Sequence, residues 1–144
     1  EGVMYYSDFF PVEEGAKYRF QCRWRSDGPA AKVFVKCYAE DESGRRREVY
    51  RSQQNLKGLK GQWNTQTEDF TPKHTKYAPR WGRIMLYAYL QPGRVEWDDV
   101  VVKLLLPASP GEAAKTRRPS AESGVTVEEM RENERRGRKP SGQE

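Results

Sequence analysis

The sequence has few of the residues that hold metals or carry out acid–base chemistry near neutral pH. Its 144 residues include one histidine, His74, and two cysteines, Cys22 and Cys37. These are too few for a zinc site of the usual Cys/His ligand number. The cysteines either form one disulfide or are small core residues, and the sequence leaves both open. No signal-peptide pattern and no apolar run long enough to span a membrane occur in these residues, so neither feature is expected from the sequence.

Catalytic motifs are missing as well. There is no glycine-rich phosphate loop and no Gly-x-Ser-x-Gly nucleophile turn. The adjacent acids Asp98 and Asp99 lie in an apolar run that predicts a strand, where neighbouring side chains point to opposite faces. They are therefore not expected to act as the paired carboxylates of a glycoside hydrolase. The sequence favours a protein that is not an enzyme.

Aromatic residues divide the chain into two parts. All 4 Trp, 8 Tyr and 5 Phe precede residue 98. We therefore predict one domain over 1–106 and a disordered, charged tail over 107–144, with a short helix at 126–136. The net charge is +5, but much of it reflects basic residues mixed with glutamates in this tail. Nucleic-acid binding is therefore not expected. The chain begins at Glu1 rather than Met, so a processed product and a fragment of a longer protein both stay open.

The first part reads as an all-β, antiparallel β-sandwich of the jelly-roll kind. Alternating residues and turn signals predict seven strands, and no helix pattern occurs before residue 107. We expect a hairpin between the second and third strands, which would bring Cys22 and Cys37 near each other. In the last strand we expect Trp97, Val100 and Val102 to face the core. The predicted strands cover 3–10, 17–25, 32–40, 45–52, 63–70, 81–90 and 93–106.

Some strands carry aromatic residues on both faces. Tyr38 lies opposite the apolar set of its strand, and so do Tyr87 and Tyr89. Flat rings on an exposed sheet can stack on the apolar faces of sugar rings, so these tyrosines, followed by Trp81, are the candidate carbohydrate-binding residues. The alternative is that missing or other parts of the chain cover this second face and the rings are core residues.

Four short motifs together resemble a known fold family. They are Val-Glu-Glu-Gly-Ala-Lys-Tyr-Arg-Phe at 12–20, Trp63 ahead of Phe-Thr-Pro at 70–72, Arg-Ile-Met-Leu-Tyr at 83–87, and Gly-Arg-Val-Glu-Trp-Asp-Asp-Val at 93–100. The pattern resembles the galactose-binding-like jelly-roll domains, which include non-catalytic carbohydrate-binding modules of secreted bacterial proteins. The resemblance covers about residues 3–105, and it suggests that the N-terminal strands usual in the family are missing here.

The resemblance implies a function and a location. It implies binding of a polysaccharide or glycan, outside the cell or in the cell envelope of a bacterium. It also implies a structural calcium at Asp98 and Asp99, because an aspartate of the last strand holds that ion in many such domains. The alternative for these acids is a turn cap or an ion pair with an arginine such as Arg83 or Arg94.

Two other functions stay open. A structural or protein–protein interaction domain is the first, with the charged tail as the partner contact. Polyanion binding is the second, because Arg19, Arg23 and Arg25 share one strand face and are expected beside the basic run at 45–47. Here we favour the reading of a solvated basic face.

Overall fold

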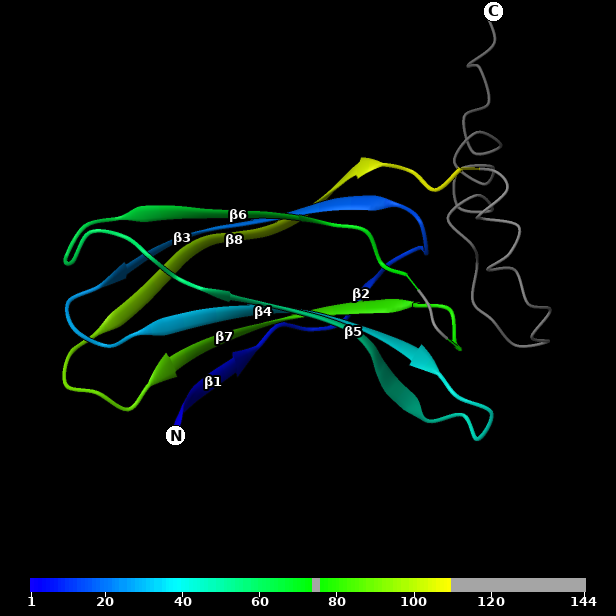
Figure 1. The fold of residues 1–144 in the computed structure, drawn as a ribbon, viewed down its shortest axis with the longest axis horizontal. Helices are drawn as coiled ribbons and strands as arrows, with labels where there is room; N and C mark the ends of the chain where they lie inside the picture. Colours follow the sequence, from blue (N-terminus) through cyan, green and yellow to red (C-terminus); the bar gives the residue numbers. More distant parts are fainter. Residues whose placement is uncertain (74–75, 110–144) are drawn as a thin grey trace, which may run out of the picture.

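The computed structural model describes residues 1–73 and 76–109, which fold into two antiparallel sheets stacked face to face (Figure 1). The five-stranded sheet has the order β1-β7-β4-β5, with β2 also pairing with β7, and the three-stranded sheet has the order β6-β3-β8. None of the described residues is helical, and the predicted all-β sandwich is confirmed. The strands are β1 (Gly2–Tyr6), β2 (Phe10–Pro11), β3 (Lys17–Ser26), β4 (Ala31–Glu40), β5 (Arg46–Asn55), β6 (Asn64–Phe70), β7 (Trp81–Tyr89) and β8 (Val95–Leu106).

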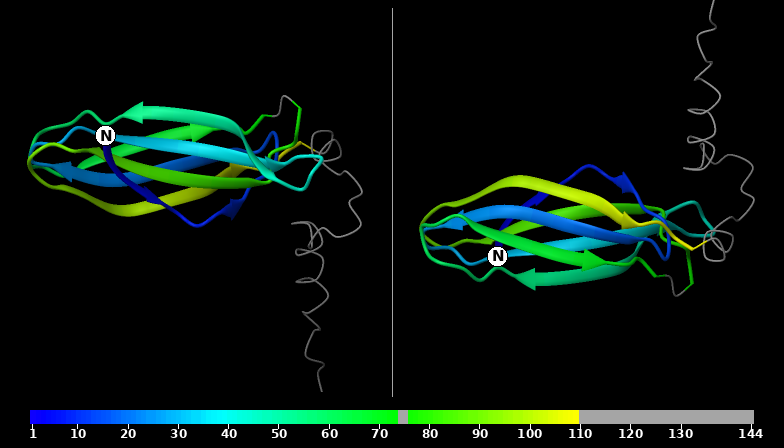
Figure 2. Two further views of the ribbon diagram at one scale, coloured as in Figure 1. Left: turned by 90° about the horizontal axis from the view of Figure 1, so that it is seen from below. Right: turned by 90° about the horizontal axis from the view of Figure 1, so that it is seen from above.

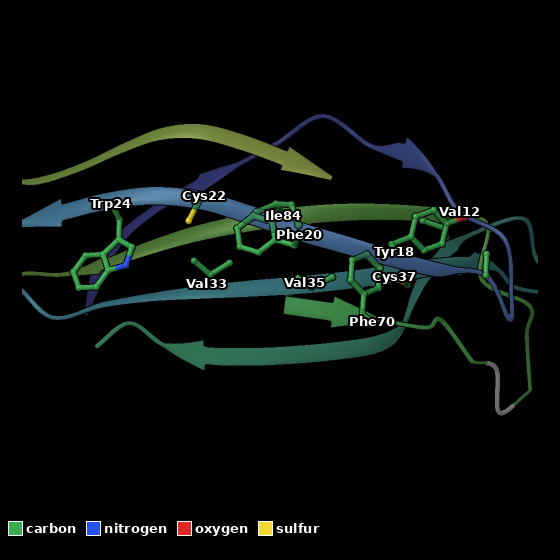
Figure 3. Close-up of a cluster of buried hydrophobic side chains, with 11 residues drawn as sticks. Val12, Tyr18, Phe20, Cys22, Trp24, Val33, Val35, Cys37, Phe70 and Ile84 are labelled. Atoms are coloured by element: carbon green, nitrogen blue, oxygen red, sulfur yellow. The ribbon is translucent and has the colours of Figure 1, made fainter. Parts of the chain in front are cut away.

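The core lies between the sheets and comes mainly from β3 and β4. Every second side chain of β3 is buried, and the inward residues of β4 oppose them from the other sheet (Figure 3). Phe20 is completely buried at the centre of this cluster. The strict alternation in both segments fixes which face turns inward. The buried cluster consists of Val12, Ala16, Tyr18, Phe20, Cys22, Trp24, Val33, Val35, Cys37, Phe70 and Ile84.

The predicted hairpin between 17–25 and 32–40 is wrong. β3 pairs with β6 and β8, whereas β4 pairs with β5 and β7. The connection after Ser26 crosses from one sheet to the other, and the hydroxyl of Ser26 donates to the carbonyl of Pro29 there at 2.6 Å. Alternation settles the buried face of a strand but leaves its hydrogen-bonding partner open. Cys22 and Cys37 are buried, free thiols.

The strand predicted over 3–10 is broken in two. β1 and β2 both pair with β7, but residues 7–9 between them leave the ladder. Ser7 keeps contact with β7: its backbone N–H donates to the carbonyl of Ile84, and its hydroxyl accepts from the N–H of Ile84, both at 2.9 Å. Phe9 therefore lies outside the regular strand, and its ring contacts Tyr38 of β4.

Strand β8 contains a bulge at its two acids. Asp99 has a φ of 50°, in the left-handed region, and the register with β3 shifts between Gln21 and Arg23. Two residues, Asp99 and Val100, then oppose one on β3, and alternation along β8 is interrupted. Val100 is 44% exposed, so its predicted core position is wrong. Trp97 and Val102, in contrast, pack against the buried cluster.

The remaining strands largely follow the prediction. β5 is charged and lies at an edge of its sheet, as expected. In Figure 2, β1 and β8 run along one side of the sandwich, while β5 and β6 lie along the other. No helix within the described residues is both long and apolar enough to cross a membrane. His74 and the helix predicted at 126–136 lie outside the described residues.

Candidate functional site

The four predicted binding residues come together on one surface. Tyr38 of β4 and Tyr87, Tyr89 and Trp81 of β7 point away from the three-stranded sheet, because their neighbours in sequence face the core. We call this exposed side of the five-stranded sheet the outer face. All four side chains are partly exposed. The described residues therefore leave all four rings partly open to solvent.

One aromatic group surrounds Trp81. Its Cα is the cross-strand partner of Tyr38, and the ring of Phe9 meets that tyrosine edge-on at a centroid distance of 5.2 Å. The guanidinium carbon of Arg46 lies 4.1 Å from the centroid of Phe9 and 4.2 Å from that of Trp81. Partial burial, and then the charge of Glu48, raises the pKa of Tyr38, so its hydroxyl stays a hydrogen-bond donor at neutral pH.

A second aromatic group lies further along the same two strands. Tyr87 and Tyr89 meet edge-on at 5.0 Å, and Phe34 approaches Tyr87 at 6.4 Å. The ammonium of Lys32 lies 5.1 Å from the centroid of Tyr89. Gly2 of β1 makes room for this group, because a side chain there would collide with the ring and hydroxyl of Tyr87.

A row of cations separates the two aromatic groups. Arg83, Lys36 and Arg51 are cross-strand partners on β7, β4 and β5. Lys36 is only 7% exposed, and its ammonium lies 5.5 Å from the ring centroid of Tyr6. Glu48 contacts both Lys36, at 3.4 Å, and Arg51, at 2.8 Å. Two of the three adjacent cations thus share one carboxylate and Arg83 pairs with no acid of the described residues, although like charges opposite each other destabilise a sheet.

The exposed side of the three-stranded sheet is built differently. Its arginines are paired with acids: Arg19 contacts Asp69 at 2.7 Å, Arg25 contacts Glu96, and Arg23 contacts Asp99 at 3.7 Å. These arginines also lie on the opposite side of the sandwich from Arg46, so the expected joint basic surface with 45–47 does not form. Unpaired positive charge gathers on the outer face instead.

Asp98 and Asp99 do not form a calcium cage with the residues around them. Both are exposed, and the N–H of Asp99 donates to the carboxylate of Asp98 at 2.8 Å. The cationic neighbour of Asp99 is Arg23, rather than Arg83 or Arg94. Within residues 1–73 and 76–109, no group of three or more His, Cys, Asp or Glu could hold a metal ion. The calcium at Asp98 and Asp99 stays a prediction, and a melting temperature that a chelator leaves unchanged would count against it.

Sequence reasoning missed part of this surface. Lys36 and Arg83 alternate with the predicted tyrosines, so period-two spacing alone places them on the same face. Tyr6 was readable in the same way once β1 was known to pair with β7. No sequence pattern placed Phe9 or Arg46 on this face. Phe9 lies there because β1 ends at residue 6, and Arg46 lies there because of the register between β5 and β4.

One of the comparisons with known proteins supports the fold. No protein-family model matches the chain, and no curated protein matches it. A solved structure titled "Family 16 Carbohydrate Binding Module-2" is similar at a TM-score of 0.51 and 12% identity, over 72% of this chain and 70% of that one. A second, titled "CBM4 structure and function", has a TM-score of 0.43 and 18% identity, over 71% and 61%. At the level of the fold, the predicted resemblance to a carbohydrate-binding module is confirmed.

Proposed function

We propose that this protein binds a carbohydrate without catalysis, through the outer face of its five-stranded sheet. The observation that carries the proposal is the gathering of Tyr38, Trp81, Tyr87 and Tyr89 on one partly exposed surface. Partly exposed rings present apolar area that would otherwise stay in contact with water. The similar structure titled as a family 16 carbohydrate-binding module supports the same reading.

The geometry favours an extended chain over a single sugar. Lys32, beside the second aromatic group, and Tyr38, in the first, are six residues apart on β4. At about 3.3 Å per strand residue the two groups are ~20 Å apart, which exceeds one sugar ring. Amide side chains at Gln53 and Asn55 of β5, which are cross-strand partners of the outward residues Phe34 and Lys32, supply donors and acceptors for hydroxyl groups.

The test is polysaccharide binding by affinity gel electrophoresis and calorimetry, with matched tyrosine variants. Tyr87→Ala should weaken binding roughly fivefold to tenfold, because it removes a stacking ring. Tyr5→Ala is the control: Tyr5 is 62% exposed but belongs to the other face of β1. Circular dichroism should show that both variants stay folded.

A second matched pair tests the other aromatic group. Trp81→Ala should also weaken binding, whereas Trp63→Ala should not, because Trp63 contacts Arg23 and Arg25 of the three-stranded sheet. If the folded wild-type protein binds no polysaccharide in a broad panel, the proposal fails. An interaction domain for another protein then becomes the better reading.

Location and partners follow from the same proposal. Polysaccharides that a binding domain would meet lie mainly outside the cytoplasm, so we place the protein outside the cell or in a bacterial envelope. A protein contact through the tail over 107–144 stays a prediction, because residues 110–144 lie outside the described part of the chain.

A further inference from the structure

The outer face has more positive charge than its own acids neutralise. Its strand positions include the cations Lys32, Lys36, Arg46, Arg51 and Arg83 and the acids Glu40 and Glu48, five against two. Glu48 is shared by two of the cations, and Glu40 pairs with Arg80 at 3.3 Å. Within the described residues, Lys32, Arg46 and Arg83 have no acid within ion-pair distance.

This excess is specific to one side of the molecule. The arginines of the three-stranded sheet form ion pairs with acids on neighbouring strands, so their charge is neutralised locally. On the outer face it keeps the buried Lys36 between Arg83 and Arg51 instead. Adjacent like charges destabilise a sheet, and a buried ammonium is poorly hydrated. An anion placed on this row would relieve both effects.

We infer that the carbohydrate bound by the outer face is an acidic polysaccharide, carrying carboxylate or sulfate groups beside its sugar rings. This inference rests on the proposed function and adds the class of ligand. The rings of Trp81 and Tyr87 stack on the sugars, and the cations between them bind the anionic groups. Arg46, which is exposed, and Arg83, which is partly exposed and donates one N–H to the carbonyl of Ser7, make the direct contacts, since guanidinium groups suit carboxylate and sulfate oxygens. Lys36 attracts the anionic groups over a longer distance through its positive charge, because its side chain is nearly inaccessible to direct contact.

A nucleic acid suits this surface less well than an acidic polysaccharide. Glu40 and Glu48 lie among the cations and would repel a continuous line of phosphates. The amides of Gln53 and Asn55, with the tyrosine hydroxyls, match the many hydroxyl groups of a sugar polymer.

The experiment compares polymers that differ only in charge. Polygalacturonate is measured against its methyl-esterified form, and dextran sulfate against dextran, by affinity electrophoresis and calorimetry of the full chain. The first pair reports on carboxylates and the second on sulfates. Xylan and mixed-linkage glucan complete the panel as neutral polymers. We expect at least one anionic member to bind at least tenfold more tightly than its neutral counterpart, with affinity that falls as salt rises.

Matched charge variants locate the effect. Arg46→Gln should weaken binding of the anionic polymer about tenfold more than binding of its neutral counterpart, the loss of one charge-assisted hydrogen bond. Arg23→Gln removes the same charge from the other sheet and should leave all binding unchanged. Lys36→Met gives a second variant on the outer face if Arg46→Gln does not fold.

The outcomes separate the two claims. Binding of neutral polymers alone, or equal binding within each pair, overturns the acidic ligand but leaves carbohydrate binding standing. Absence of binding across the whole panel overturns both claims. Equal loss in Arg46→Gln and Arg23→Gln, or tighter binding to single-stranded DNA than to any polysaccharide, shows a response to total charge and overturns the inference.

Discussion

We expect two substitutions at one ion pair of the outer face, between the buried Lys36 and Glu48, to change the stability of the protein unequally. Lys36→Met removes the ammonium, and Glu48→Gln removes its carboxylate partner. The ammonium lies 3.4 Å from the carboxylate, an attraction of about 5 kcal/mol at an effective dielectric constant of about 20. Loss of hydration opposes this by several kcal/mol, and Arg83 and Arg51 on the flanking strands repel the ammonium as well.

The two variants differ in what they leave behind. Lys36→Met leaves Glu48 paired with Arg51 at 2.8 Å and places a thioether beside the rings of Tyr6 and Phe34. We expect the free energy of unfolding to be unchanged or raised by about 1 kcal/mol. Glu48→Gln leaves three adjacent cations without a carboxylate. It should lower that free energy by about 2 kcal/mol, which is reduced from the fully buried case because Glu48 is partly exposed.

Urea unfolding followed by tryptophan fluorescence measures both changes. The difference of about 2–3 kcal/mol corresponds to melting temperatures that lie roughly 8–24 °C apart in a domain of this size. High salt should partly restore Glu48→Gln, because it screens the remaining repulsion. If Lys36→Met is the less stable variant, the lysine stabilises the sheet. The argument that the cation row is destabilised by repulsion until an anion binds is then refuted.

Three further predictions concern other parts of the molecule. Burial raises the pKa of Cys22 to about 11 and that of Cys37 to about 12, so neither thiol should react with Ellman's reagent at pH 8 until urea is added. Hydrogen bonds from Ser43, and then Arg47, hold the pKa of Asp41 well below its usual range. The carboxylate of Asp41 therefore contributes to the free energy of unfolding above its unfolded pKa of about 3.9, and this contribution is lost as the pH falls toward the lower folded pKa. The difference in the free energy of unfolding between the wild type and Asp41→Asn should shrink below pH 4, and a constant difference would contradict this. At the bulge, Asp99→Val should be less stable than Asp99→Gly by about 1–2 kcal/mol, because a β-branched side chain is strained at the positive φ of this position.

Much of the fold was readable from the sequence because strand alternation is a local property. The segment around Phe20 has an apolar residue at every second position, and burial follows that pattern residue by residue. The same rule placed Tyr38, Tyr87 and Tyr89 opposite the core before any partner strand was known. Period-two spacing thus determined the sandwich, its core and the chemistry of one face.

Pairing between distant strands was decided only by the tertiary structure. The sequence does not show that β3 and β4 belong to different sheets, because an inward-facing strand buries the same side chains with either neighbour. Local backbone breaks were equally hidden: the bulge at Asp99 exposes Val100, and the gap after β1 releases Phe9 toward Tyr38. The cation row exists because β7, β4 and β5 align Arg83, Lys36 and Arg51 across three strands, and that register depends on contacts between segments far apart in the chain.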